Sequence, residues 1–340
     1  MAQLELKIEE VRVLSQRIFE NAGVPGQDAA VVVDNLITAD VLGVASHGLM
    51  RVAAYVGRIK KGLTNPVPQI GVKKVADNMF KVNADHALGQ VAAMRALELC
   101  MEQAKKSGNA IAVINHMNHI GMVSYYTKKA AEHGLLAFAC TNASPTMAPF
   151  GGLDCLLGTN PFSVSFGAGK YDNFTLDVAT AAVARGKIRM YQKEGKLLPQ
   201  GWAIDAEGND TTDPAEALKG SLLPMAAHKG YGLAMIIDAL SGIVADADLS
   251  CEAESMFNAT VPANTGCYMS VVDVRRFVEP ETFTARAEKW FDRIKASKLR
   301  PGFSEVFIPG EIENRKAKQA AGTFKLLDKT WDELRELAGE

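Results

Sequence analysis

Between residues 90 and 141 the chain alternates between segments with helical spacing of apolar residues and short runs rich in β-forming residues. The pattern predicts a helix over 90–107, a strand at Ala110–Asn115, a helix over 121–133 and a strand at Leu135–Thr141. Successive strand, helix and strand segments form βαβ units, which bring some strands into parallel pairing. This alternation predicts an α/β fold with a mixed sheet.

Further strands and helices follow on the same grounds. The patterns predict two short strands within 63–90, strands at Phe162–Phe166, Asn173–Val178 and Gly266–Val274, an apolar helix at Lys229–Ala245 and an amphipathic helix over 280–297.

The two chain ends have a different character, because both are helical in pattern. We expect helices at Leu4–Ala22, at Asp28–Val41 with Asp28 as its N-cap, and at His47–Lys61, and a polar helical tail over 313–338.

Composition excludes several classes of function. The 37 basic and 39 acidic side chains nearly balance, so the charge predicts no binding to nucleic acid or to an anionic membrane. The apolar stretches are too short for a membrane-spanning helix, and the charged start MAQLELKIEEVRVL does not resemble a secretion signal. Five cysteines without a CxxC pair are typical of reduced thiols. We therefore expect a cytoplasmic protein.

The first candidate site is the stretch that begins with Ser46, His47 and Gly48. In the expected helix, Ser46 is the N-cap, and His47, Arg51 and Tyr55 follow at a spacing of four residues on one face. Arginine beside a helix N-terminus can bind a carboxylate, and an imidazole can exchange a proton near neutral pH. The spacing alone is equally compatible with a surface helix that carries an incidental histidine and arginine.

The second candidate is His116-Met117-Asn118-His119, which follows the strand at Ala110–Asn115. A His-x-x-His pair can bind a metal, but no third ligand or cysteine–carboxylate cluster lies nearby in the sequence. We therefore predict no metal site. The alternative is a polar turn at the carboxyl end of a strand, where α/β proteins bind ligands.

The third question is whether the chain contains a dinucleotide-binding motif. Gly167-Ala168-Gly169 follows a strand, but a third glycine and a following helix are both missing. A Rossmann site needs that helix to bind the pyrophosphate, so we reject this interpretation. Local motifs therefore identify no cofactor.

A set of short stretches along the whole chain resembles a known family. They are 39–48 (ADVLGVASHG), 150–152 (FGG), 158–161 (GTNP), 176–180 (LDVAT), 186–187 (GK), 201–203 (GWA), 211–214 (TTDP), 223–224 (LP), 229–233 (KGYGL) and 308–311 (IPGE). In this order they resemble the malate/L-lactate dehydrogenase family that includes ureidoglycolate, sulfolactate and diketogulonate enzymes. That family is unrelated to the Rossmann-type lactate and malate dehydrogenases, so the missing glycine motif is expected.

The resemblance implies a homodimer with a non-Rossmann, nicotinamide-binding mixed-sheet domain and a helical domain formed by both chain ends. We expect residues 1–75 to form the N-terminal part of the helical domain and 76–300 the nicotinamide-binding domain. The tail 301–340 is expected to return to the N-terminal part. The active site would lie in the cleft between the domains.

The resemblance also implies roles for individual residues. His47 donates or accepts the proton, Arg51 binds the substrate carboxylate, and His119 is a second candidate base that lies near the nicotinamide. Ser46, Tyr55, Thr159 and Asn160 are the other expected substrate-binding residues. The expected cofactor-binding residues are His119, Asn142, Asp177, Val178, Ala179, Lys229, Gly230, Pro309, Gly310 and Glu311.

Lys187 is placed beside the active site by the resemblance, although by pattern alone it is a solvated lysine at a helix start. Relatives that reduce cyclic imines have aspartate there, so Lys187 favours oxo-acid chemistry. We therefore expect an NAD(P)-dependent enzyme, with NAD slightly favoured, that interconverts a small malate- or lactate-like 2-hydroxy acid and its 2-oxo acid.

Three alternatives stay open at this point. The substrate is alternatively ureidoglycolate or sulfolactate, because specificity depends on a few pocket side chains. Either His47 or His119 can carry the proton. A catalytically inactive protein that binds a nucleotide or an acid is the alternative from a different class.

Overall fold

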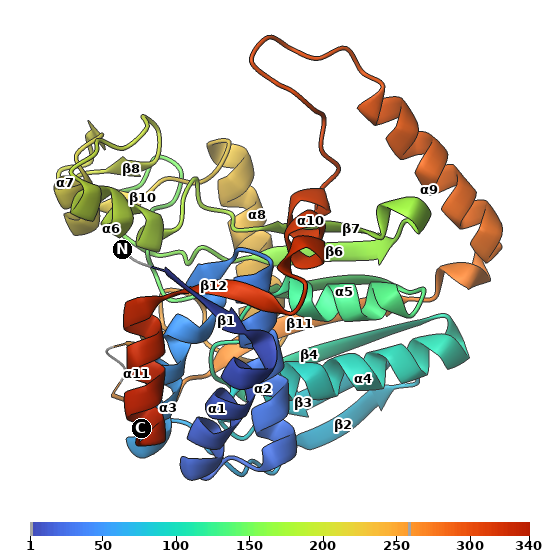
Figure 1. The fold of residues 1–340 in the computed structure, drawn as a ribbon, viewed down its shortest axis with the longest axis horizontal. Helices are drawn as coiled ribbons and strands as arrows, with labels where there is room; N and C mark the ends of the chain where they lie inside the picture. The colour runs from blue at the N-terminus through green and yellow to red at the C-terminus, as the bar shows by residue number, and fades with distance from the viewer. Residues whose placement is uncertain (1–2, 258–259) are drawn as a thin grey trace.

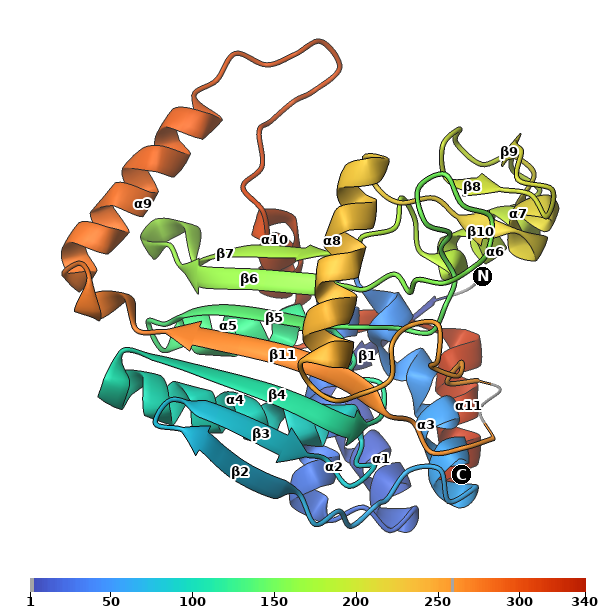
Figure 2. The ribbon, with the colours of Figure 1, turned by 180° about the vertical axis from the view of Figure 1, so that it is seen from behind.

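The computed structural model describes residues 3–257 and 260–340, and a seven-stranded mixed sheet forms its centre. The strand order is β2-β3-β4-β11-β5-β6-β7. The strands are β2 (Gly71–Ala76), β3 (Met79–Asn83), β4 (Asn109–Met117), β5 (Leu136–Thr141), β6 (Phe162–Gly167), β7 (Asn173–Val178) and β11 (Thr265–Val272). Helices α4 (Gly89–Ser107) and α5 (Ser124–Glu132) pack on one face, and Figure 2 shows the strands from the other.

The predicted βαβ units are present, with one strand inserted. Strand β3 pairs with β4 in parallel through α4, which confirms the expected parallel pairing. Strands β4 and β5 are also joined by a helix, α5, but β11 lies between them and pairs antiparallel with both. The late strand of the chain therefore completes the centre of the sheet.

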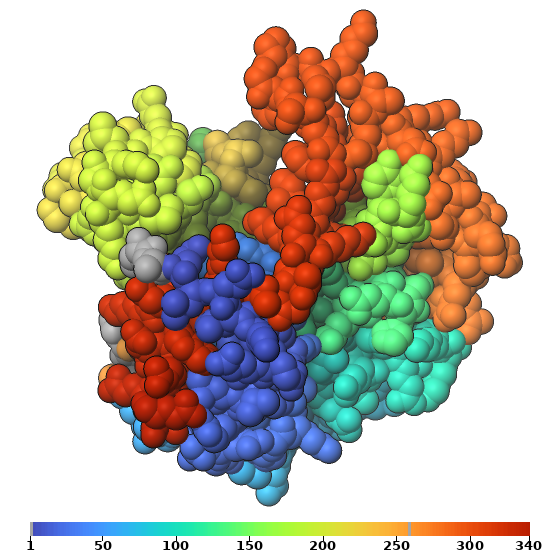
Figure 3. Space-filling model, viewed as in Figure 1, coloured from blue at the N-terminus to red at the C-terminus, as the bar shows by residue number. Residues whose placement is uncertain are grey.

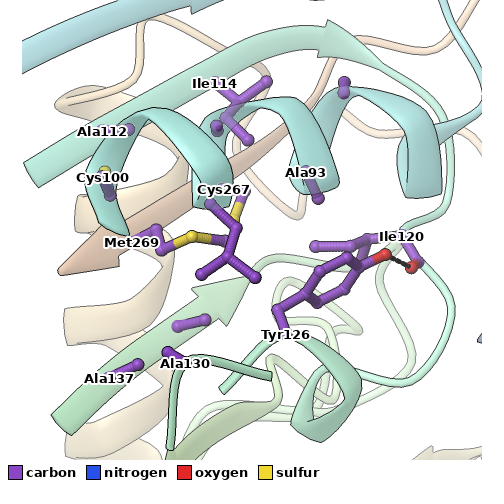
Figure 4. Packing of buried hydrophobic residues seen from close by; sticks show 14 of the residues in the cluster. Ala93, Cys100, Ala112, Ile114, Ile120, Tyr126, Ala130, Ala137, Cys267 and Met269 are labelled. Carbon is purple, nitrogen blue, oxygen red and sulfur yellow. Dashed lines mark hydrogen bonds between the residues drawn. The ribbon is translucent and has the colours of Figure 1, made fainter. Parts of the chain in front are cut away.

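The main core lies between this sheet and helices α4 and α5. Small and sulfur-containing side chains allow the layers to approach closely, among them Cys100 from α4, Ala137 from β5, and Cys267 and Met269 from β11 (Figure 4). All four are buried. Tyr126 also lies in this core, and its hydroxyl satisfies the carbonyl oxygen of Ile120 at 2.6 Å.

The two chain ends form a second packed unit (Figure 1). Strand β1 (Gln3–Lys7) pairs antiparallel with β12 (Thr323–Leu327), and helix α1 (Ile8–Asn21) packs against α2 (Gly26–Val41) and α11 (Asp328–Ala338). The expected helix at Leu4–Ala22 is thus wrong for its first residues. The expected tail over 313–338 is two helices, α10 (Glu311–Ala320) and α11, with a strand between them.

The expected helix at His47–Lys61 is also wrong in its first half. Two 3₁₀ turns, Ala45–His47 and Leu49–Arg51, are separated by Gly48 in an extended conformation, and the α-helix α3 spans Val52–Lys60. Ser46 lies within the first turn and does not cap a helix. Helix α2 likewise begins after Pro25, so Asp28 lies in its first turn and is not its cap.

Residues 185–222 form a small lobe with its own core. It contains α6 (Arg185–Glu194), α7 (Pro214–Lys219) and the short strands β8 (Ala203–Ile204), β9 (Asp210–Thr211) and β10 (Ser221–Leu222). The expected apolar helix at Lys229–Ala245 is α8 (His228–Asp238) followed by a π-helical turn at Ala239–Ile243. Gly266, which has no side chain, packs against the carbonyl of Ser241 in that turn.

Helix α9 (Pro280–Lys295) and the segment that follows it arch away from the body before the chain enters α10 (Figure 1, Figure 2). No helix in the described part of the chain is long and apolar enough to cross a membrane. The division into residues 1–75, 76–300 and 301–340 stays a prediction. Strand β2 spans its first boundary, and the first two residues and 258–259 lie outside the described chain.

Candidate active site

A cavity of about 490 Å³ is lined by five segments of the chain. They are the stretch that contains His47, the start of α5, the residues just before β6, the end of β7 with the residues before α6, and the segment that leads into α10. Figure 3 shows a surface recess between the yellow-green lobe of α6 and α7 and the red segment of α10. Ala184 and Ile312, from these two borders, both line the cavity.

His47 lies at the end of the first 3₁₀ turn and is half-buried. Its Nδ1 lies 2.9 Å from the hydroxyl of Ser46. Burial, and to a smaller extent the positive charge of Arg51, lowers the pKa of His47 from 6.5 to about 4. His47 is therefore an uncharged imidazole at neutral pH that borders the cavity.

His119 lies beside His47, and the two rings stack with their centroids 5.6 Å apart. The hydroxyl of Tyr55 lies 2.7 Å from Nδ1 of His119, and the amide of Gly121 donates to the same nitrogen at 3.2 Å. Burial lowers the pKa of His119, and the charges of His47 and Arg51 add to this effect. Both imidazoles therefore stay neutral in the same small region.

Arg51 projects from the second 3₁₀ turn and is held from two sides. Its Nε donates to the carbonyl oxygen of Ser46 at 2.7 Å, and its guanidinium lies 5.1 Å from the ring centroid of Phe257. Burial lowers the pKa of Arg51, and the charge of Arg189 on α6 contributes to this lowering. A second cation therefore lies close to the expected carboxylate-binding residue.

The single helix face predicted for His47, Arg51 and Tyr55 does not exist, because Gly48 separates the turns. His47 and Tyr55 are nevertheless brought together through His119, which contacts both, and the charge of Arg51 acts on both His47 and Tyr55. Tyr55 is buried in α3, and its hydroxyl also receives a hydrogen bond from Gln90 at 3.1 Å.

Asp40, near the end of α2, holds the loop of the two 3₁₀ turns that carries His47 and Arg51. Its carboxylate accepts the amide of Leu49 at 2.7 Å, and it fills the space beside Gly48 where a side chain would stand. Burial raises the pKa of Asp40 to about 7, although the hydrogen bond from Leu49 opposes the rise. The glycine of the Ser-His-Gly stretch is thus required by a close approach.

Several of the expected cofactor-binding residues line the cavity together. Asp177 ends β7, and its carboxylate accepts the amide of Ser124 at the start of α5 at 3.2 Å. Removal of water by the surrounding protein raises the pKa of this carboxyl group. The other predicted residues in the lining are Thr159, Val178, Ala179, Pro309 and Gly310.

Other expected residues lie outside the cavity lining. Asn142 and Asn160 are buried, and their amides bond within the protein: Asn142 to Asp238, Asp248 and Gly266, and Asn160 to Ala143, Ala234 and Ser250. Their role in this structure is to fix the loops behind the site.

The remaining expected residues also lie outside the cavity lining and have other neighbours in the structure. Glu311 pairs with Lys295 at 2.8 Å and with Arg315 at 2.7 Å. Lys229 is exposed at the start of α8, and Gly230 packs against the carbonyl of Met225. Lys187 is exposed on α6, with its ammonium 5.1 Å from the ring centroid of Trp202.

The two histidines of the His-x-x-His stretch point to different neighbours. His116 packs edge-on against His86 at 5.5 Å, whereas His119 contacts His47 and Tyr55. Among the described residues, no three His, Cys, Asp or Glu side chains gather in a way that could hold a metal ion.

Sequence reasoning missed four polar residues of this region. Ser124, Lys128 and Glu313 line the cavity, and Arg189 lies near Arg51. Ser124 opens the helix predicted over 121–133, so its place at a strand-to-helix turn was a usable signal. Arg189 gave no such signal, because α6 reaches the site only through the packing of the lobe.

A nicotinamide dinucleotide suits the residues that line this cavity. The amino end of α5 supplies backbone amides, and Lys128 supplies a positive charge for a pyrophosphate. Asp177 offers acceptors for hydroxyl or amide groups. The volume is within the range of small-molecule sites. A half-buried arginine beside two neutral imidazoles, one of which lines this cavity, is typical of an enzyme site for a small anionic substrate.

Comparisons with known proteins agree with this class. The family described as malate/L-lactate dehydrogenase matches residues 6–335. L-sulfolactate dehydrogenase of Methanocaldococcus jannaschii is 36% identical over 335 residues, which cover 98% of this chain and 96% of that protein. The structure of sulfolactate dehydrogenase from that organism covers 99% of this chain and 97% of its own, with a TM-score of 0.94 and 35% identity.

Two further relatives are named for other acids. Malate dehydrogenase of Pyrococcus horikoshii is 37% identical over 304 residues, 87% of this chain and 83% of that protein. The NAD(+)-dependent ureidoglycolate dehydrogenase of Escherichia coli K12 is 32% identical over 319 residues, 94% of this chain and 91% of that protein. The chain therefore belongs to the malate/L-lactate dehydrogenase family and is an NAD(P)-dependent hydroxyacid dehydrogenase.

Proposed function

We propose that the protein oxidises a small 2-hydroxy acid reversibly to the 2-oxo acid at the site formed by His47, Arg51 and His119. The observation that carries this proposal is the Arg51 guanidinium, whose charge acts on two stacked, uncharged imidazoles, one of which, His47, lines the cavity. When bound, the nicotinamide accepts the hydride from C2. The protein must bind the acid, orient C2 and take up the hydroxyl proton.

Arg51 is the proposed carboxylate-binding residue. Its Nε is already bonded to Ser46, so the two terminal nitrogens are the donors that remain for a paired contact with carboxylate oxygens. Met256 Sδ, at 3.6 Å from Nη1, is a weak acceptor that a carboxylate would displace. Such binding fixes C2 relative to the imidazoles and can contribute several kcal/mol to the lowering of the barrier.

We propose a substrate that carries a second anionic group, as malate and sulfolactate do. The charge of Arg189 contributes to the lowered pKa of Arg51, so a second cation lies within electrostatic reach of the proposed carboxylate-binding residue. Relatives named for malate and for sulfolactate are consistent with this. Ureidoglycolate is the alternative, but its neutral ureido group needs no second cation.

The substrate proposal is tested by Arg189→Gln, with oxaloacetate and pyruvate as paired substrates. Loss of one charged contact costs about 1.5–3 kcal/mol, so KM or kcat/KM for oxaloacetate should worsen by roughly 10- to 100-fold. The values for pyruvate should change little. Equal changes for both acids would contradict the assignment of Arg189.

We propose that Ser124, Lys128, Asp177 and Gly310 contact the cofactor, and that NAD is preferred to NADP. The preference is supported by two carboxylates in the lining, Asp177 and Glu313, because acidic groups favour a ribose hydroxyl over a 2′-phosphate. A higher kcat/KM with NADP than with NAD would contradict the proposed preference for NAD.

We further propose a cytoplasmic homodimer. The proposed location is supported by cysteines that all remain free thiols in the described chain. The dimer is supported by apolar side chains exposed on α8 and the π-helical turn after it: Leu233, Met235, Ile236, Ile243 and Val244. A sedimentation velocity measurement that finds a monomer at micromolar concentration would contradict the dimer.

A further inference from the structure

Two groups lie within hydrogen-bond distance of Nδ1 of His119, and one of them, a backbone amide, decides which ring nitrogen carries the proton. The amide of Gly121 lies 3.2 Å from Nδ1, and the hydroxyl of Tyr55 lies 2.7 Å from it. A backbone amide can only donate, so Nδ1 must be the nitrogen without hydrogen when this bond exists. In a neutral imidazole the hydrogen then resides on Nε2.

Tyr55 contributes to the same arrangement. Its oxygen accepts the side-chain amide of Gln90 at 3.1 Å, which leaves its own hydrogen for Nδ1 of His119. The amide of Gly121 is the stronger constraint, because a backbone donor cannot turn around as a glutamine amide can. A doubly protonated, charged His119 would lose the hydrogen bond from Gly121 and would require the hydroxyl of Tyr55 to turn and accept from Nδ1–H.

His47 has no such restriction. Its Nδ1 faces the hydroxyl of Ser46 at 2.9 Å, and a hydroxyl can either donate or accept. With Nδ1–H donating to Ser46, Nε2 of His47 can gain or lose a proton while that hydrogen bond persists. The charged and titratable groups around the two rings are Arg51 and Tyr55, with Arg189 beyond Arg51.

We propose that His119 is locked as the Nε2–H tautomer by Gly121 and Tyr55, and that it donates a hydrogen bond to the C2 oxygen while His47 carries the proton. This inference rests on the proposed oxidation of a 2-hydroxy acid. As the hydride leaves C2, the hydroxyl O–H bond breaks and its proton passes to Nε2 of His47. The oxygen becomes a carbonyl that accepts from Nε2–H of His119. Tyr55 is a positioning residue, because it acts through His119.

The tautomer is tested directly in the protein without substrate. Nitrogen-15 NMR of histidine-labelled protein, with the His119 signals assigned by their loss in His119→Gln, should show a bare Nδ1 and a protonated Nε2. This pattern should persist from about pH 6 to 9, because burial and the neighbouring charges hold the pKa of His119 below its usual range. A hydrogen on Nδ1 at neutral pH would overturn the inference. This result does not depend on activity, so it is independent of the proposed function.

The division of roles is tested by matched variants at the two histidines. The His119→Gln amide can donate from the position of Nε2 but cannot take up a proton, so kcat should fall modestly and the pH dependence of oxidation should persist. His119→Leu removes the donor and should lower kcat by about 10²–10³-fold, again with the pH dependence intact. His47→Gln should lower kcat by about 10²–10⁴-fold and abolish the pH dependence. Loss of the pH dependence in His119→Gln, with its retention in His47→Gln, would overturn the proposal.

Discussion

The chemistry of single residues here depends on keeping two imidazoles uncharged beside a cation. Burial is the larger cause of the low pKa of His47, and Arg51 is the smaller one. A substrate carboxylate on Arg51 would compensate its charge, so binding of the acid should raise the pKa of His47 towards the ordinary value of 6.5. The base would thereby become stronger when the hydroxyl proton has to be removed.

The contribution of Arg51 predicts a shift in the pH profile. In the proposed mechanism oxidation needs uncharged His47, so kcat/KM should fall as pH drops through the pKa of about 4 in the free protein and should be level above it. Arg51→Gln removes the cation and should move this fall to higher pH, whereas Arg51→Lys keeps the charge and should leave it in place. Both variants should raise KM for the acid. Identical pH profiles in the two variants would mean that Arg51 does not act on His47.

Gly48 provides a second test at this scale. A side chain there would place its Cβ 2.3 Å from the carboxylate of Asp40, so Asp40 must move and release Leu49. Gly48→Ala should lower the free energy of unfolding by about 1–3 kcal/mol and reduce kcat, because the loop carries His47. The control is Gly57→Ala in α3, where nothing lies within 4 Å of the new Cβ. It should stabilise the protein by up to about 1 kcal/mol, as measured by urea denaturation.

The candidate residues were partly readable from the sequence. The Ser-His-Gly stretch and Arg51 were candidates because an arginine beside an expected helix N-terminus can bind a carboxylate and an imidazole can exchange a proton, and the family resemblance gave them roles that stay predictions. The hydrogen bond from Tyr55 to His119 could not, because it joins residues 64 positions apart. The effect of Arg189 on Arg51 could not be predicted either, because it depends on how the lobe of residues 185–222 packs against the rest of the chain.

At the scale of elements, the pairing of β1 with β12 joins the first and last strands of the chain. The pairing brings Gln3 opposite Leu327 and Lys7 opposite Thr323. Phe324 and Leu326 alternate inward to the core that α1, α2 and α3 share, while Lys325 points to solvent. The helical unit that carries Arg51 and Tyr55 therefore depends on the last residues of the chain.

This dependence predicts a contrast between neighbouring residues of β12. Leu326 is 5% exposed, so Leu326→Ala should lower the free energy of unfolding by about 2–5 kcal/mol. Lys325→Ala changes an exposed side chain opposite Glu5 and should cost less than about 1 kcal/mol. Urea denaturation of both variants provides the measurement. A similar loss in both would show that β12 does not anchor the core.

Elements with local signals were predictable, and those that depend on a distant partner were not. The strands β4 to β7 and helices α4, α5 and α9 have clear periodicity, and the structure confirms them within a few residues. Strands β1 and β12 are five residues each and lie next to amphipathic helices, so only their mutual pairing distinguishes them from helix. The position of β11 between β4 and β5 could not be predicted from local pattern either, because it depends on pairing with two strands that lie far away in the sequence.

At the scale of the molecule, the cavity exists only because five parts of the chain converge. The stretch with His47 comes from the unit formed by the chain ends, and Asp177 and Ser124 come from the sheet and its helices. The segment 307–310, with Gly310 packed against Thr175, closes a further side. The proposed substrate-binding and cofactor-binding groups thus belong to different structural units that meet at one site.

The central claim is that the hydrogen at C2 of a 2-hydroxy acid is transferred to a nicotinamide cofactor at this site. The most direct measurement uses acids deuterated at C2, with malate first and then sulfolactate, lactate and ureidoglycolate. The reduced NAD or NADP that forms is then analysed by mass spectrometry. The account predicts deuterium in the reduced cofactor with at least one acid, and markedly less product with Arg51→Gln. Failure to form any deuterated cofactor from all four acids would contradict it and favour a protein that only binds its ligands.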